Sequence, residues 1–307
     1  MDFEHIPVLF DEAIDALDIH YNRIYVDCTA GGGGHSAAIA EKITDGRLIA
    51  IDQDPEAIEI LRERLGSFKN VTVVHDNFIN LQAILAANGI EKADGILADL
   101  GVSSHQFDKA ERGFSFHNDA PLDMRMSKTG KSAADLVNTL SQNALQKIIY
   151  DYGEERYAPS IARGIVRARE ISPIKTTFEL VDIIKAAIPA AARREGGHPA
   201  RRTFQALRIE VNGELDKLEA AIGIMFSALN PGGRLAIITF HSLEDRIVKK
   251  SFAAFCEGCT CPPQFPVCIC GNIAKGSLPF KAKKPSVEQI ENNPRCRSAR
   301  LRVIEKT

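Results

Sequence analysis

The chain of 307 residues lacks any long apolar run and any strong excess of charge. No apolar stretch approaches the roughly 20 residues of a membrane-spanning helix, so we expect no membrane anchor. The N-terminal segment MDFEHIPVLFDEA is too acidic for a secretion signal, which predicts a cytoplasmic location. A formal net charge of −2 excludes a general cationic coat for nucleic acid, because such binding depends on Lys and Arg releasing counterions. Basic patches are therefore expected only locally.

Cysteine is concentrated in one place. Five of the seven cysteines lie between Cys256 and Cys270, and in a cytosolic chain this favours a metal or unpaired thiols over disulfides. Two C-x-C pairs supply enough thiolates for one tetrahedral zinc, although zinc sites more often have C-x2-C spacing. The possible structural zinc ligands are Cys259, Cys261, Cys268 and Cys270.

A glycine-rich loop near the N-terminus is the first functional signal. The apolar run Ile24 to Asp27 predicts a strand, and Gly31 to Gly34 then lead into a helix beginning near Ser36. Glycines let a ligand approach the backbone, and a helix N-terminus offers unpaired N–H groups. A second buried strand ends at Asp52, at a spacing typical of an acid that binds ribose hydroxyls. This pattern predicts a nucleoside site, and it suits both NAD and S-adenosylmethionine.

Strands and helices continue to alternate after this loop. Further strands are expected at Val71 to His75, at Gly95 to Asp99 and at Arg234 to Phe240, the last after a turn at Asn230 to Gly233. Helices are expected within residues 1–20 and at 55–65, 79–87, 204–229 and 244–255, the last capped by Ser242 with Asp245 at its third position. Two more strands, at 278–283 and 298–305, could pair antiparallel. This order predicts a doubly wound parallel sheet whose carboxyl ends bring together Asp27, Asp52, Asn77, Phe78 and Asp99.

The alternation stops in the middle of the chain. Helical periodicity without a convincing strand predicts an inserted all-helical domain at 108–202, and leaves 1–107 and 203–307 to the sheet domain. A loop without apolar periodicity ends this insert and carries four arginines. Flexible basic loops often contact phosphates, so RNA binding is predicted for Arg193, Arg194, Arg201 and Arg202.

Asp99 opens the motif DLGVSSHQFDKAERGFSFHNDAPLDMRM. This motif resembles a signature of the bacterial ribosomal RNA small subunit methyltransferase H family, which methylates a cytosine N4 in 16S ribosomal RNA. Further matching blocks are HIPVLFDEA, DCTAGGGGHS, AIDQDPEAI, YGEERYAPSIARGIV, HPARRTFQALRIEVNGEL, FHSLEDRIVK and NPRCRSARLR. The turn LNPGG before the fifth strand likewise resembles that of class I methyltransferases, whose sheet is Rossmann-like.

The resemblance implies S-adenosylmethionine as cofactor and 16S ribosomal RNA, or the small subunit, as partner. The cofactor contacts that it implies are Gly33, Gly34, His35, Asp52, Phe78, Asp99 and Gln106. Asp99 could either contact the cofactor or act catalytically, by accepting hydrogen bonds from the target amine. A homodimer is implied by the resemblance alone. The alternatives are a dehydrogenase and a non-catalytic ribosome-assembly RNA-binding protein with a vestigial cofactor site.

Overall fold

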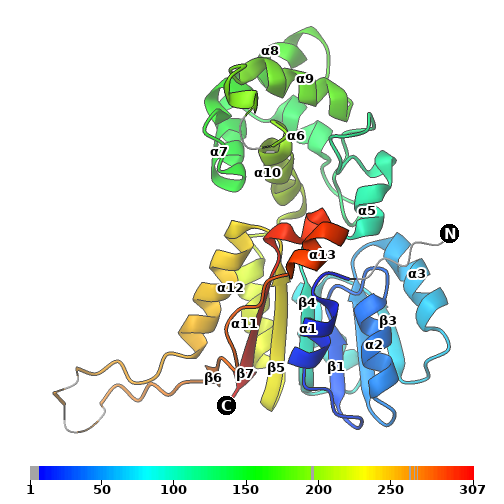
Figure 1. The fold of residues 1–307 in the computed structure, drawn as a ribbon, viewed down its shortest axis with the longest axis vertical. Helices are drawn as coiled ribbons and strands as arrows, with labels where there is room; N and C mark the ends of the chain where they lie inside the picture. The colour runs from blue at the N-terminus through cyan, green and yellow to red at the C-terminus, as the bar shows by residue number, and fades with distance from the viewer. Residues whose placement is uncertain (1–6, 195–196, 263, 266, 268) are drawn as a thin grey trace. The chain divides into compact units, whose positions relative to one another are not determined.

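The computed structural model describes residues 7–194, 197–262, 264–265, 267 and 269–307. The chain divides into two compact units (Figure 1). The sheet unit comprises Met1–Gly101 and Leu215–Thr307, and the helical unit comprises Val102–Glu214. The sequence predicted boundaries after residues 107 and 202, whereas the structure has them after residues 101 and 214, a difference of 6 and 12 residues. Among the described residues, no helix has the length and apolar character needed to cross a membrane.

The sheet unit contains one seven-stranded sheet in the order β3-β2-β1-β4-β5-β7-β6. The strands are β1 (Ile24–Asp27), β2 (Arg47–Asp52), β3 (Val71–His75), β4 (Ala93–Asp99), β5 (Leu229–Thr239), β6 (Gly276–Ser277) and β7 (Arg300–Lys306). The first five strands pair in parallel, whereas β7 is antiparallel to both β5 and β6. The carboxyl ends of β1 to β5 therefore share one edge, and the strand predicted near 298–305 runs antiparallel to β5.

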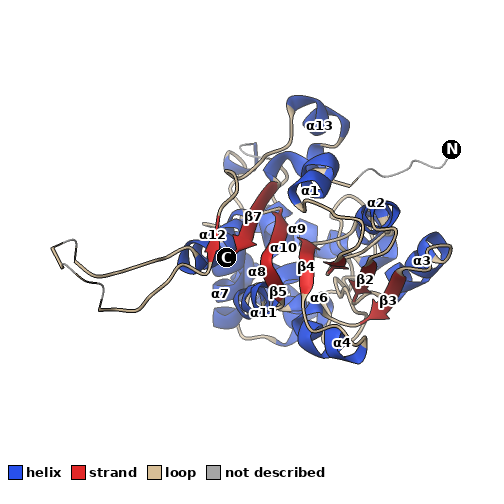
Figure 2. Cartoon of the chain, turned by 90° about the horizontal axis from the view of Figure 1, so that it is seen from below, coloured by secondary structure: helices blue, strands red, loops and turns tan. Residues whose placement is uncertain are grey.

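Helices cover both faces of this sheet (Figure 2). They are α1 (Phe10–Ala16), α2 (Gly34–Lys42), α3 (Pro55–Leu65), α4 (Leu81–Ala87), α11 (Leu218–Ser227), α12 (Ser242–Phe255) and α13 (Val287–Asn292). Side chains alternate along each strand, so Ile96 packs in the cluster with α4, α11 and α12 while Leu97 packs with α1 and α2. Because both faces are buried, the central strands read as continuous apolar runs.

Three sequence predictions are wrong at the level of single elements. The long helix predicted over 204–229 is two helices, because Gly213 adopts a left-handed φ of 58° and ends α10 (Arg201–Asn212) before α11 begins. The predicted turn at Asn230 to Gly233 lies inside β5, where the pairing with β4 shifts register between Ala93 and Gly95. The chain at 278–283 forms only one isolated bridge, from Lys283 to Leu301.

The helical unit has its own hydrophobic core. Its elements are α5 (Ser104–Asp108), η2 (Ala110–Arg112), α6 (Ala133–Thr139), α7 (Gln142–Gly153), α8 (Ala158–Ile171), α9 (Thr177–Ala187), η3 (Ala192–Arg194) and α10. Ile161, Ile165 and Leu180 are fully buried in the core that these helices share. A capping box begins α9: Thr176 and Glu179 each accept the other's backbone N–H.

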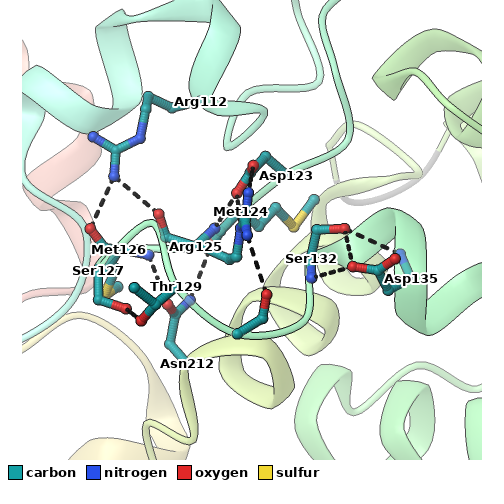
Figure 3. A network of polar contacts seen from close by, with 11 residues as sticks. Arg112, Asp123, Met124, Arg125, Met126, Ser127, Thr129, Ser132, Asp135 and Asn212 are labelled. Atoms are coloured by element: carbon teal, nitrogen blue, oxygen red, sulfur yellow. Dashed lines mark hydrogen bonds and ion pairs between the residues drawn. The ribbon is translucent and has the colours of Figure 1, made fainter.

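The second half of the motif that begins at Asp99 builds this unit (Figure 3). Asn212 in α10 accepts a hydrogen bond from the Met126 N–H at 2.8 Å and donates one to the Met124 carbonyl at 2.9 Å. The guanidinium of Arg112, which is 5% exposed, donates to the Arg125 and Met126 carbonyls. The motif's loop is therefore fixed by side chains that satisfy its backbone.

A long segment between α12 and β6 extends away from the sheet, and we call it the cysteine arm (residues 257–275; Figure 1). Its described residues form no helix or strand, and none of them is buried. Its base is closed by the Lys275 N–H, which donates to the Phe255 carbonyl at 2.8 Å. The side chain of Asn272 adds hydrogen bonds to the Glu257 and Gly258 carbonyls. Burial therefore contributes little to holding this segment.

Candidate cofactor site at the carboxyl edge of the sheet

The glycine loop turns sharply between β1 and α2. Gly33 has a φ of 77°, a left-handed conformation that favours glycine, and it serves as the N-cap of α2. A Cβ at Gly33 would approach the side chains of Leu61 and Arg64 to 3.1 and 3.2 Å. A Cβ at Gly34 would meet Pro7 at 2.5 Å. These two positions therefore require glycine, which agrees with a loop shaped for close backbone approach.

Asp27 ends β1 and is buried, with 1% of its surface exposed. Its carboxylate accepts hydrogen bonds from the Ser36 hydroxyl at 2.6 Å and from the Thr29 N–H at 3.2 Å. Burial nevertheless raises the pKa of Asp27 to about 6, because it disfavours the charged form more than these two donors favour it. Asp27 thus fixes the start of α2 against the end of β1.

Asp52 ends β2 and holds the glycine loop from the other side. Its Oδ2 accepts a hydrogen bond from the Gly31 N–H at 2.7 Å, and its Oδ1 accepts one from the Asp54 N–H at 2.8 Å. The Asp52 carboxylate also accepts the Gln53 backbone N–H, so about one of a carboxylate's four acceptor positions stays available to a ligand's hydroxyl. Burial raises the pKa of Asp52 as well. The sequence did not indicate this second role, in which Asp52 braces the loop.

The end of β3 contributes an aromatic ring and an amide. Asn77 caps η1 (Phe78–Asn80) by accepting the Ile79 N–H, and its amide donates to Gln53 at 2.8 Å. This bond ties the end of β3 to the residue that follows Asp52. Phe78 is partly buried against the core cluster under α4 and α11.

Asp99 ends β4 beside the glycine loop and α2. Its backbone N–H donates to the Thr29 hydroxyl at 2.6 Å, and its Oδ2 lies 3.9 Å from Nδ1 of His35. About 22% of the Asp99 side chain is exposed, yet its Oδ1 is buried without a hydrogen-bond partner among the described residues. Burial, followed by the charges of Asp27 and Glu244, raises the pKa of Asp99 well above its usual value. A buried acceptor of this kind is suited to an external donor.

His35 lies in the first turn of α2 and is 5% exposed. Its ring stacks on Phe10 with the centroids 5.6 Å apart, and its Nε2 has no partner among the described residues. Burial lowers the pKa of His35 to about 4, so the ring is neutral at physiological pH. His35 and Asp99 therefore meet as a neutral ring beside an acid, each with one unsatisfied buried atom.

The turn after β5 differs from its prediction. His241, not Ser242, is the N-cap of α12, and Glu244, not Asp245, is the third helical residue. The His241 ring accepts the Glu244 N–H, while Glu244 accepts the N–H groups of Phe240 and His241. Asp245 instead pairs with Arg302 on β7 at 2.7 Å. Histidine is an uncommon N-cap, which is why the sequence favoured the serine.

The remaining predicted cofactor and RNA contacts lie in the helical unit, and one predicted zinc ligand lies outside the description. Gln106 lies in the helical unit, where it completes a capping box with Ser103 at the start of α5. Arg193 and Arg201 are exposed, and Arg202 donates to the Glu154 carbonyl at 3.1 Å. Arg194 lies in η3 with a side chain outside the description, and Cys268 lies outside the described residues.

The strand order, the single antiparallel strand β7 and the glycine loop after β1 define a class I methyltransferase fold. The model of the MraW methylase family matches residues 2–307, and the chain belongs to that family. It is 53% identical over 310 residues to the ribosomal RNA small subunit methyltransferase H of Symbiobacterium thermophilum, which covers 100% of this chain and 98% of the relative. The protein of the same description from Lachnospira eligens is 54% identical over 310 residues, again covering 100% and 98%.

Proposed function

We propose that this protein transfers a methyl group from S-adenosylmethionine to the exocyclic N4 amine of a cytidine in small-subunit (16S) ribosomal RNA. The observation that carries the proposal is the convergence of Asp27, Asp52 and Asp99 with the glycine loop at one sheet edge. In open parallel sheets, ligands bind outside the carboxyl ends of the strands. The relatives named as ribosomal RNA methyltransferases support the choice of RNA as the substrate.

The buried carboxyl groups at this edge of the sheet suit a cationic nucleoside. Burial raises the pKa of Asp27, Asp52 and Asp99, so each carboxylate would be stabilised by a positive ligand placed nearby. S-adenosylmethionine carries a cationic sulfonium whose methyl group is electrophilic. The unsatisfied buried atoms, Oδ1 of Asp99 and Nε2 of His35, are further positions for ligand groups. The residues present therefore fit the cofactor.

Each predicted contact has a physical role in this proposal. Gly33 and Gly34 would line the methionine portion with their backbone, and the remaining acceptor position of Asp52 would take a ribose hydroxyl. Phe78 offers an apolar surface to the adenine. Gln106 stays a cofactor contact on the strength of the family resemblance alone.

Asp99 is proposed to orient the target amine as well. The lone pair of a cytosine amine is delocalised into its ring, so acceptors for its hydrogens favour the tetrahedral geometry that can attack a methyl carbon. In the transfer the amine nitrogen would bond to the methyl carbon while the carbon–sulfur bond breaks and S-adenosylhomocysteine leaves, and the proton that the amine loses would pass to the Asp99 carboxylate. The neutral ring of His35 at 3.9 Å supplies no counter-ion, so the raised pKa of Asp99 requires a cationic ligand nearby to favour the ionised form that accepts the amine N–H.

The helical unit is proposed to bind the RNA. Arg193 and Arg201 are exposed near the ends of the loop, where guanidinium groups can contact phosphates. Arg194 and Arg202 are proposed as further contacts. We also propose a cytoplasmic location and a homodimer, and that any zinc held by Cys259, Cys261, Cys268 and Cys270 is structural rather than catalytic.

The test uses small ribosomal subunits from a strain in which the gene for this protein is deleted. Incubation with the purified protein and S-adenosylmethionine should produce N4-methylcytidine, identified by nucleoside mass spectrometry. Asp99→Ala should lower the turnover by about 10²- to 10³-fold, the usual effect of removing one such group. RNA affinity, measured by filter binding, should stay unchanged.

The same experiment separates the alternatives. A purified protein that binds subunits but forms no methylated nucleoside would support a non-catalytic assembly factor. If Asp99 serves only the cofactor, Asp99→Ala should weaken S-adenosylhomocysteine binding and leave turnover at saturating cofactor intact. If Asp99 acts on the amine, turnover falls at saturating cofactor.

A further inference from the structure

Three thiols converge within the cysteine arm. The Sγ atoms of Cys259, Cys261 and Cys270 all lie within 4.8 Å of one another, and those of Cys259 and Cys270 are 3.7 Å apart. A disulfide needs about 2.05 Å between sulfurs, so this last pair is not bonded. Zinc bound by thiolates at about 2.3 Å in tetrahedral geometry places neighbouring sulfurs about 3.8 Å apart. The observed spacing therefore matches the edge of such a tetrahedron.

The backbone around these sulfurs is arranged to stabilise negative charge. The N–H groups of Ile269 and Cys270 both point at Sγ of Cys261, each at 3.3 Å. Those of Thr260 and Asn272 point at Sγ of Cys270, at 3.4 and 3.5 Å. A neutral thiol is a weak acceptor, whereas a thiolate bound to a metal takes such hydrogen bonds as its outer support. Two sulfurs thus receive two N–H donors each.

The arm also needs a stabilising element other than a core. None of its described residues is buried, and the side chains of Val267, Ile269 and Ile273 are 70 to 78% exposed. Structureless loops of this length are uncommon in compact domains unless they are functional. A bound metal contributes folding free energy to such small segments, because the site does not exist in the unfolded chain.

We propose that Cys259, Cys261 and Cys270 bind one Zn²⁺ as thiolates and that this ion fixes the conformation of the cysteine arm. Thiolate ligands in tetrahedral geometry select zinc or iron, and the hard cations magnesium and calcium prefer oxygen. The three thiolates leave the fourth tetrahedral position of the ion to a further ligand. The ion is separate from methyl transfer and acts on the arm alone.

The test measures metal content in protein made without a polyhistidine tag and purified under reducing conditions. Mass spectrometry of the metals should find one equivalent of zinc in the unaltered chain. Cys261→Ser and Cys270→Ser should each lose most of it. Cys256→Ser is the matched control, because Cys256 packs against the sheet unit's core and should keep the full equivalent. Unchanged binding of S-adenosylhomocysteine would show that each variant is folded.

A second measurement reports the ligands directly. Cobalt added to metal-free protein should give thiolate-to-metal charge transfer and the strong visible bands of a tetrahedral site, both absent in Cys261→Ser. Zinc retained by Cys261→Ser, iron in place of zinc, or an unaltered chain with no metal would overturn the proposal. A disulfide among these cysteines in freshly reduced protein, detected by alkylation, would overturn it too.

Discussion

The carboxyl edge of the sheet and the cysteine arm belong to the same unit but hold their polar groups by opposite means. At the edge, Asp27 and Asp52 are fixed by backbone and hydroxyl donors inside a packed core. In the arm, sulfurs collect N–H donors with no core beneath them. The comparison indicates that a packed core can hold carboxylates despite the cost of their desolvation. For the exposed cysteine arm, which has no core, we propose a bound metal as the stabilising link.

The largest expected effect tests the buried charge at the edge. The raised pKa of Asp27, about 6, stabilises the folded protein below pH 3.8, and this contribution is lost as pH rises through 6. The lowered pKa of His35, about 4, works in the opposite sense: its contribution is present above pH 6.5 and is lost as pH falls through 4. Each shift corresponds to about 3 kcal/mol, so the two nearly offset each other between pH 4 and 7.

Single substitutions should separate the contributions of Asp27 and His35 to the pH dependence of the unfolding free energy. Between pH 7 and 4, Asp27→Asn should lose about 2–3 kcal/mol more unfolding free energy than the unaltered protein, because the stabilisation that Asp27 gains on protonation over this range is removed. His35→Gln should show a relative gain of similar size. Urea unfolding at several pH values measures both. Parallel pH profiles for all three proteins would mean that neither group is as buried as described.

A smaller effect is expected at the glycine loop. Gly33→Ala should lower the unfolding free energy by about 1–2 kcal/mol, since alanine is strained at a φ of 77° and its Cβ would crowd Leu61 and Arg64. It should also weaken S-adenosylhomocysteine binding in calorimetry. Gly32→Ala is the matched control, because its Cβ would meet nothing within 4 Å. Equal losses in both variants would contradict a specific requirement at Gly33.

Sequence reasoning found the edge because its signals are local. Buried strands that end in acids are visible as apolar runs, and β3 and α3 have the predicted limits. The break at Gly213 was missed although Asn-Gly is a turn signal, because apolar periodicity continues on both sides of it. The bracing of the loop by Asp52 joins positions 21 residues apart, which only the folded chain brings together. Whether the predicted contacts bind cofactor or RNA stays a prediction.

The corrected cap of α12 gives a prediction of about 1 kcal/mol. His241→Ala should destabilise the protein by that amount, the usual cost of losing an N-cap. His241→Asn should restore most of the loss, because asparagine is a good N-cap. Thermal unfolding is precise enough for this comparison. If Ser242→Ala costs more than His241→Ala, the cap is the serine that the sequence favoured.

The smallest expected effect tests whether the two regions are independent. Cys261→Ser removes a proposed zinc ligand from a segment with no buried described residue, so it should change the unfolding free energy of the sheet by less than about 0.5 kcal/mol. Limited proteolysis should nevertheless cut the arm faster, because cleavage follows local opening rather than global stability. Ile58→Ala, in the core under α3, is the positive control: it should clearly lower the unfolding free energy, which would show that the assay reports the sheet. If Cys261→Ser instead destabilised the sheet as much as Ile58→Ala, the arm would be part of the fold's cooperative core.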